Sequence, residues 1–199
     1  MISNELLWNQ KGLIAWSIAT LITLGVFTGG ISDQLQFGNQ AICLLNIQDY
    51  RKDASESWVF EAHSGHCSTA ISYGWMGIFL LFASIGTRFY FLYKKEEPSR
   101  TVLMVLASAA SFWAFVSLIM GFVVSGGVAH TCEQFEKSGK SCGAVFGEGF
   151  YANNKDVVYK KNINTINAAT GSGWALVLFW IMYAAYEWHS YRHASLKWW

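Results

Sequence analysis

The sequence predicts an all-α membrane protein: a four-transmembrane-helix bundle with two disulfide-braced exterior loops. Formal charge is nearly absent from four apolar stretches and is concentrated between them; these are residues 12–32, 71–93, 101–125 and 168–190. Each stretch is about as long as the ~20 residues that a helix needs to cross a bilayer. Arg88 and Glu187 are the only charged residues within those limits, and both lie near an end. With 53% hydrophobic residues and one proline among 199, the chain is expected to form a single membrane domain.

The first apolar stretch is expected to remain in the mature protein. It is longer than the apolar core of a secretory signal peptide, and no clear small-x-small cleavage site follows it before Asp33. We therefore expect a retained first helix that also acts as a signal anchor.

Basic residues predict the orientation of the four spans. The short loop 94–100 carries three Lys or Arg residues, and others lie beside the first and last spans, at Lys11, Arg192 and Lys197. Lys and Arg in short loops near span ends favour the cytoplasmic side. We therefore expect a cytoplasmic loop 94–100 and both termini in the cytoplasm. The longer loops, 33–70 and 126–167, are then exterior.

The cysteines support the same orientation. All four lie in the two exterior loops, at Cys43, Cys67, Cys132 and Cys142. An even number confined to the oxidising side of a membrane indicates two disulfides. Three pairings are open. We favour Cys43–Cys67 and Cys132–Cys142, because each of these closes a loop within one excursion.

Small residues recur at a spacing of four within the spans. The first span has Gly25 and Gly29. The third has two such pairs, Ala107 with Ser111 and Gly121 with Ser125, and the fourth has Ala169 and Gly173. Helices in a bilayer associate by close backbone approach over such residues. Two interpretations stay open: packing within the bundle, or docking of one face onto another membrane protein.

The predicted spans contain few residues that could support catalysis, metal binding or ion transport. Ionisable groups at mid-membrane would mark a proton relay, an ion path or a substrate site, and the polar residues there are mostly Ser and Thr. His63, His66 and Cys67 have superficial metal-ligand spacing, but no further His or carboxylate completes a set. No catalytic motif is visible, so we expect no enzyme, no metal and no cofactor. A net charge of +1 without a basic stripe argues against nucleic-acid binding.

Aromatic residues gather in the exterior loops, with Trp58 and Phe60 in the first and Phe135 and Phe146 in the second. Aromatic-rich, disulfide-braced loops suit protein contacts. The same aromatics could instead form the small core of the loops themselves. Both interpretations stay open, and they are not exclusive.

A set of loop motifs carries a family resemblance. Cys43-Leu44-Leu45 follows the first span, Cys67 precedes the second, Cys132-Glu133 lies in the second exterior loop, and Ser141-Cys142 comes some ten residues later. In these motifs the chain resembles the transmembrane protein 179 family. Claudins and calcium-channel gamma subunits share the broader four-span plan, but their Gly-Leu-Trp and paired-cysteine signature is absent. The family has no established enzymatic activity, so the resemblance implies an accessory membrane protein.

The expected function is therefore that of a non-catalytic accessory subunit of a larger membrane complex. Its partner would be an ion channel or receptor whose assembly, trafficking or gating it affects, or a second copy of the chain, with membrane lipids around it. One alternative is a self-associating scaffold or adhesion protein of claudin or tetraspanin type. Another is a lipid-modifying or lipid-transfer protein, which the lack of intramembrane charge argues against. The plasma membrane is the expected location.

Overall fold

The computed structural model describes residues 4–37, 42–62, 65–152, 156–158 and 160–196. The chain divides into two compact units. We call Met1–Gly25, Trp75–Ile119 and Trp174–Trp199 the helical unit. We call Val26–Gly74 and Met120–Gly173 the β-sheet unit.

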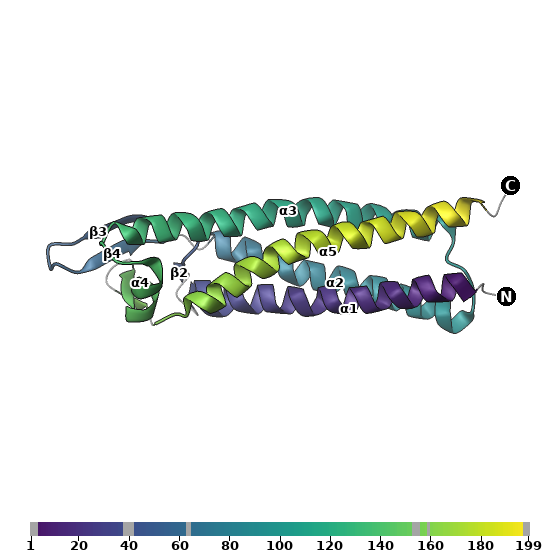
Figure 1. The fold of residues 1–199 in the computed structure, drawn as a ribbon, viewed down its shortest axis with the longest axis horizontal. Helices are drawn as coiled ribbons and strands as arrows, with labels where there is room; N and C mark the ends of the chain where they lie inside the picture. Colours follow the sequence, from purple (N-terminus) through teal and green to yellow (C-terminus); the bar gives the residue numbers. More distant parts are fainter. Residues whose placement is uncertain (1–3, 38–41, 63–64, 153–155, 159, 197–199) are drawn as a thin grey trace. The chain divides into compact units, whose positions relative to one another are not determined.

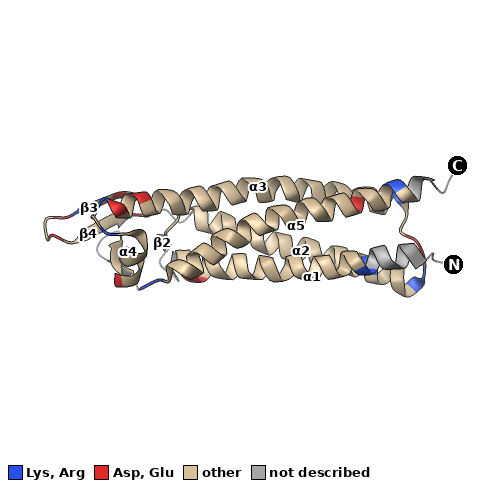
Figure 2. Ribbon diagram, in the orientation of Figure 1, with Lys and Arg blue, Asp and Glu red and all other residues tan. Residues whose placement is uncertain are grey.

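Four long helices dominate the chain (Figure 1): α1 (Asn4–Gly30), α2 (Gly65–Lys94), α3 (Arg100–Glu136) and α5 (Ile163–Leu196). Among the residues that the structure describes, four segments are long and apolar enough to cross a membrane, which agrees with the predicted number of candidate spans; they are Lys11–Leu35, Gly65–Lys94, Arg100–Glu136 and Ile163–His193. Lys, Arg, Asp and Glu are absent from the middle of each helix and gather toward helix ends and in the connecting segments (Figure 2).

The helical unit has an apolar interior. Its fully buried side chains include Leu24, Leu81, Ala107, Leu176 and Trp180. Pro98 falls between α2 and α3, which suits a chain that must leave one helix and enter the next. The start of α1, the segment between α2 and α3, and the end of α5 lie at the same end of this unit (Figure 1).

The third helix is longer than the predicted span 101–125, because α3 continues to Glu136. The reason is a buried stripe that continues past the predicted end, formed by Val124, Val128, Thr131 and Phe135 at spacings of three and four residues. The predicted exterior loop 126–167 therefore begins as helix.

The all-α prediction is wrong for the two longer loops, which contain strands. The short strands β1 (Gln36–Phe37) and β2 (Ile42–Cys43) form an antiparallel pair after the π-helical turn Ile31–Leu35. A four-stranded sheet has the order β3-β4-β5-β6. Its strands are β3 (Gln48–Lys52), β4 (Trp58–Glu61), β5 (Phe150–Ala152) and β6 (Asp156–Val158).

The sheet joins two loops that are distant in sequence. β4 and β5 pair in parallel, with Val59 opposite Tyr151 and Phe60 opposite Ala152. Phe150 and Ala152 are buried while Tyr151 is exposed, which is the period of two that a one-sided sheet requires. Parallel strands need a long connection, and here it runs from β4 in the first loop to β5 in the second. The pairing therefore joins the two loops into one folded structure.

A short helix precedes β5. Helix α4 (Cys142–Glu148) begins at Ser141, whose side chain accepts a hydrogen bond from the Ala144 backbone N–H. It ends at Gly149, which has a φ of 87°. A Cβ at Gly149 would lie 3.1 Å from the Val158 carbonyl oxygen, so both the conformation and the space favour glycine.

Candidate functional site

Both favoured disulfides are present in the β-sheet unit. Cys43 is bonded to Cys67 and Cys132 to Cys142, with S–S lengths of 2.00 and 2.01 Å. Cys43 and Cys67 are fully buried, and the Cys67 backbone N–H donates a hydrogen bond to Cys43 Sγ over 3.1 Å. The first bridge thereby ties β2 to the first turn of α2, and the second ties the end of α3 to α4.

The aromatic residues of the two loops form one core. Phe135 of α3 contacts four rings at centroid distances from 4.9 to 6.1 Å; these are Tyr50, Phe60, Phe146 and Phe150. Phe60 is 1% exposed, and Phe135 and Phe146 are not exposed at all. These three residues were candidates for partner contact, and the structure places them in the interior instead. Trp58 differs, because it stacks on Tyr50 and remains partly exposed.

Backbone contacts also fasten the first loop to α3. Thr131 donates its hydroxyl to the Leu44 carbonyl over 2.8 Å, and its Oγ1 accepts a hydrogen bond from the Ile47 backbone N–H. The Asn46 backbone N–H donates to the Gly127 carbonyl over 3.1 Å. These contacts explain why α3 carries a buried Thr in an otherwise apolar stripe, since that hydroxyl satisfies the backbone of a buried segment.

The small residues of the spans separate into two groups. Ala107, Gly121 and Gly173 are buried, and Gly173 lies against the ring of Phe27, which would be 3.0 Å from an added Cβ. Ser111 accepts a hydrogen bond from the Trp188 indole N–H over 2.9 Å. Gly25 and Gly29 are exposed, and nothing lies within 4 Å of a Cβ added at either.

Two glycines that the spacing analysis did not select make the closest helix contacts. A Cβ at Gly30 would lie 2.7 Å from the Ala169 Cβ, and one at Gly74 would overlap the Thr28 side chain. All four residues belong to the β-sheet unit. Each glycine allows a backbone approach that any larger residue would prevent.

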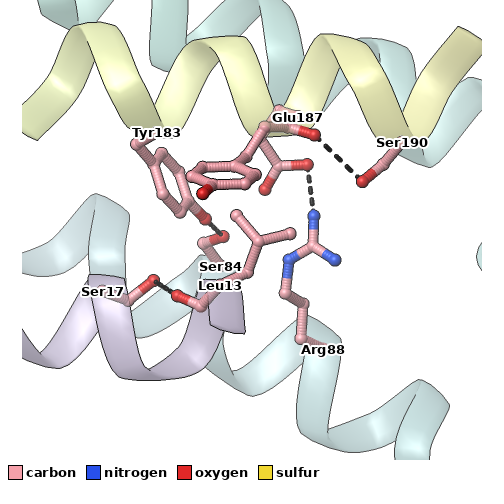
Figure 3. Close-up of polar contacts among 8 residues, drawn as sticks. Leu13, Ser17, Ser84, Arg88, Tyr183, Glu187 and Ser190 are labelled. Carbon is pink, nitrogen blue, oxygen red and sulfur yellow. Dashed lines mark hydrogen bonds and ion pairs between the residues drawn. The ribbon is translucent and has the colours of Figure 1, made fainter. Parts of the chain in front are cut away.

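A buried polar cluster lies within the helical unit (Figure 3). Arg88 of α2 and Glu187 of α5 form an ion pair, and their side chains are 2% and 0% exposed. One helical turn earlier on each helix, Ser84 and Tyr183 share a hydrogen bond. Ser17 of α1 faces the same region and donates its hydroxyl to the Leu13 carbonyl over 2.7 Å.

The ion pair leaves polar atoms without partners. Arg88 Nε and Glu187 Oε1 are buried and make no hydrogen bond with any residue that the structure describes. Sequence reasoning noted both residues as the only charges within the spans but did not pair them. The available signal was that opposite charges lie near the same predicted side of the second and fourth spans.

The histidines make no metal centre among the described residues, where no group of three or more His, Cys, Asp or Glu side chains is placed to hold a metal ion. His63 lies outside the described residues, and His66 is exposed. The rings of His189 and His193 approach each other at Nε2, 3.0 Å apart, on the exposed side of α5.

Comparisons of the chain with protein-family models, with curated proteins and with solved structures find no significant match in any of the three. The resemblance to the transmembrane protein 179 family therefore stays a prediction, and function must be argued from the chain itself.

Proposed function

We propose that this chain is a four-span integral membrane protein that acts as a non-catalytic accessory subunit of a larger membrane complex, such as an ion channel or receptor. The two longer loops face the exterior and the termini face the cytoplasm, in the plasma membrane. One observation carries the proposal: the two loops fold together, through the β4–β5 pairing and a shared aromatic core, into a single disulfide-braced structure.

The outer surface of the helices supports membrane insertion. Large apolar side chains of the helical unit are strongly exposed, among them Ile22, Phe79, Phe112 and Leu178. So large an exposed apolar surface is unusual on a soluble monomer. In a bilayer, lipid chains as apolar as these side chains would cover it. The backbone between these side chains is helical, as a membrane-spanning segment requires.

The β-sheet unit suits recognition better than catalysis. Its aromatic residues are used to fix the loops in place, and its edge strand β3 presents the polar side chains Gln48, Asp49, Arg51 and Lys52 to solvent. A rigid surface pays little ordering entropy on binding. Charges at its rim steer a partner and set the register of docking. Such a surface shifts a partner's conformational equilibrium when it binds one state better than another.

The test is affinity purification of the tagged full chain from native membranes in mild detergent, followed by mass spectrometry. We expect one larger integral membrane protein at a fixed molar ratio. The variant Arg51→Glu/Lys52→Glu reverses charge on the exposed edge of β3 and is expected to reduce that ratio. Lys137→Glu, an exposed lysine directly after the end of α3 rather than on β3, is the control and should leave the ratio unchanged.

Other outcomes reject the proposal. A monodisperse single copy without a companion contradicts an accessory role. Self-oligomers alone favour the scaffold or adhesion alternative. A companion that binds the edge variant and the wild type equally contradicts recognition through β3.

A further inference from the structure

The β-sheet unit contains a cavity of about 240 Å³ next to its aromatic core. Residues from both loops line it: Tyr50 of β3, Glu56 of the β3–β4 turn, Trp58 of β4, Glu148 of α4, and Phe150 and Tyr151 of β5. The cavity exists only because the sheet brings the two loops together. It is smaller than the pockets of several hundred Å³ that hold drug-sized ligands, so it suits a single small group.

Four of the eleven residues that line the cavity are aromatic: Tyr50, Trp58, Phe150 and Tyr151. Tyr50 and Trp58 are stacked with their ring centroids 4.7 Å apart and their planes inclined by 21°. Phe150 lies on the core side, since it is 4% exposed, and Tyr151 is 39% exposed. Aromatic faces carry a negative quadrupole that attracts cations.

The charged residues of the cavity give it a net negative charge. Glu56 and Glu148 contribute two carboxylates, and Lys140 contributes one ammonium group that pairs with Glu148. The sum of two negative charges and one positive charge is −1. Glu56 makes no ion pair with any part of the chain that the structure describes, so its carboxylate is available to a ligand.

The phenol of Tyr50 stays neutral in this setting. Burial raises its pKa above the usual value, the hydrogen bond with Ser138 lowers it, and the negative charge of Glu148 raises it again. Ser138 also lines the cavity. The phenol is therefore neutral at physiological pH, and it adds no negative charge of its own to the cavity.

We propose that this cavity binds a small organic cation, a single ammonium group bearing methyl or methylene substituents. Aromatic walls and one uncompensated carboxylate are the combination that recognises alkylammonium groups. An anion would meet the net negative charge, and a neutral ligand would gain only the apolar contacts. The cavity lies wholly within the β-sheet unit, so the proposal does not depend on the accessory-subunit function.

The test is isothermal titration calorimetry of the full chain in maltoside detergent, with choline as the cation. The matched ligand is 3,3-dimethyl-1-butanol, which has the same shape and no charge. We expect choline to bind about tenfold more tightly than this neutral isostere, as one cation–π contact and one carboxylate allow. Choline affinity should fall as the salt concentration rises.

Variants of the charged residues should change the affinity for choline in opposite directions. Glu56→Gln and Glu148→Gln remove one negative charge each and should weaken choline binding about three- to tenfold, because these carboxylates are partly screened by solvent. Lys140→Gln removes the positive charge and should strengthen binding. Trp58→Leu should weaken it, and Glu133→Gln, an exposed carboxylate outside the cavity, should have no effect. The thermal transition of each variant shows whether it is folded.

A second experiment distinguishes two sources of the cation, a lipid headgroup and a free solute. If phosphatidylcholine nanodiscs, but not phosphatidylglycerol nanodiscs, prevent choline binding, the natural ligand is a lipid headgroup. If neither prevents it, the ligand is a free cation. The proposal is overturned if choline does not bind in the millimolar range, if choline and its neutral isostere bind equally, or if Lys140→Gln weakens binding in a folded protein.

Discussion

Arg88 on α2 and Glu187 on α5 form an ion pair one helical turn beyond the hydrogen bond between Ser84 and Tyr183 on the same two helices. Both pairs span a sequence separation of 99 residues. Equal separations mean that α2 and α5 run parallel here, with one fixed register. Because the pair is buried in an apolar interior, any slip of one helix along the other would leave two charges unpaired, at a large cost.

Removal of either charge alone is expected to destabilise the helical unit. Arg88→Met or Glu187→Leu leaves the other charge buried without a partner, which costs about 3–5 kcal/mol. The double variant Arg88→Met/Glu187→Leu should recover most of that loss, because two apolar side chains of similar size replace the pair. A double-mutant cycle on thermal unfolding in detergent measures the coupling. Additive losses would contradict a direct, buried pair.

Gly74→Ala is expected to disturb the packing of α2 against α1 within the β-sheet unit. The added methyl group would overlap the Thr28 side chain, and overpacking of this kind costs about 1–3 kcal/mol. Thr28→Ala should relieve part of the loss, because it removes the atoms that the methyl group would meet. The thermal stability of both variants checks this.

Gly29→Ala is the matched control for Gly74→Ala. A Cβ there meets nothing within 4 Å, so the fold should tolerate the change. The same variant tests the docking interpretation of the Gly25 and Gly29 face. If a partner helix packs there, Gly29→Ala lowers the amount of co-purified companion while thermal stability is unchanged. A stability loss equal to that of Gly74→Ala would contradict the open face.

The two disulfides should stabilise the β-sheet unit unequally. Their sequence separations are 24 and 10 residues, for which chain entropy gives about 3.5 and about 2.8 kcal/mol. We expect Cys43→Ser/Cys67→Ser to increase hydrogen exchange in the strands more than Cys132→Ser/Cys142→Ser does. The reverse order would show that the shorter bridge holds more of the structure than its loop length implies.

Tyr50 should make the β-sheet unit less stable at alkaline pH. Burial, the largest cause, raises the pKa of its phenol, so the unfolded state loses this proton first as the pH rises above about 10. The stabilisation is complete below that pH and is lost as the pH rises through the folded pKa. Between pH ~9 and ~11, about one unit either side of the usual tyrosine pKa, the free energy of unfolding measured with denaturant should fall more steeply for wild type than for Tyr50→Phe. Parallel curves would contradict the shift.

The helices and disulfides could be predicted because their signals are local. Apolar runs of about span length identify helices without reference to their neighbours, and each disulfide closes within one loop. The sheet could not be predicted in the same way. Its strands are three to five residues long, and the pairing of β4 with β5 joins segments about ninety residues apart, for which a single sequence carries no register signal.

The surroundings of the candidate site residues could not be predicted from the sequence, for two physical reasons. The spacing of small residues identifies a face of a helix but not the direction in which that face points, so Gly25 and Gly29 were selected and Gly30 and Gly74 were not. Aromatic residues in a loop serve equally as core or as contact surface. Only the three-dimensional pairing of the loops places Phe135 in the interior and leaves Trp58 at the edge of a cavity.

In the proposed topology the chain crosses a membrane four times, with both longer loops on the exterior side. Glycosylation mapping tests it most directly, because single substitutions create Asn-x-Ser/Thr acceptors: Asp53→Asn in the first loop, Glu136→Asn in the second, at the end of α3, and Ser99→Asn between α2 and α3. A Ser99→Cys variant, labelled with an impermeant maleimide before and after permeabilisation, controls for an acceptor too close to the membrane.

We expect glycosylation at positions 53 and 136, none at 99, and labelling of Cys at 99 only in permeabilised cells. Glycosylation at only one of the two loops, or labelling at 99 in intact cells, would contradict it.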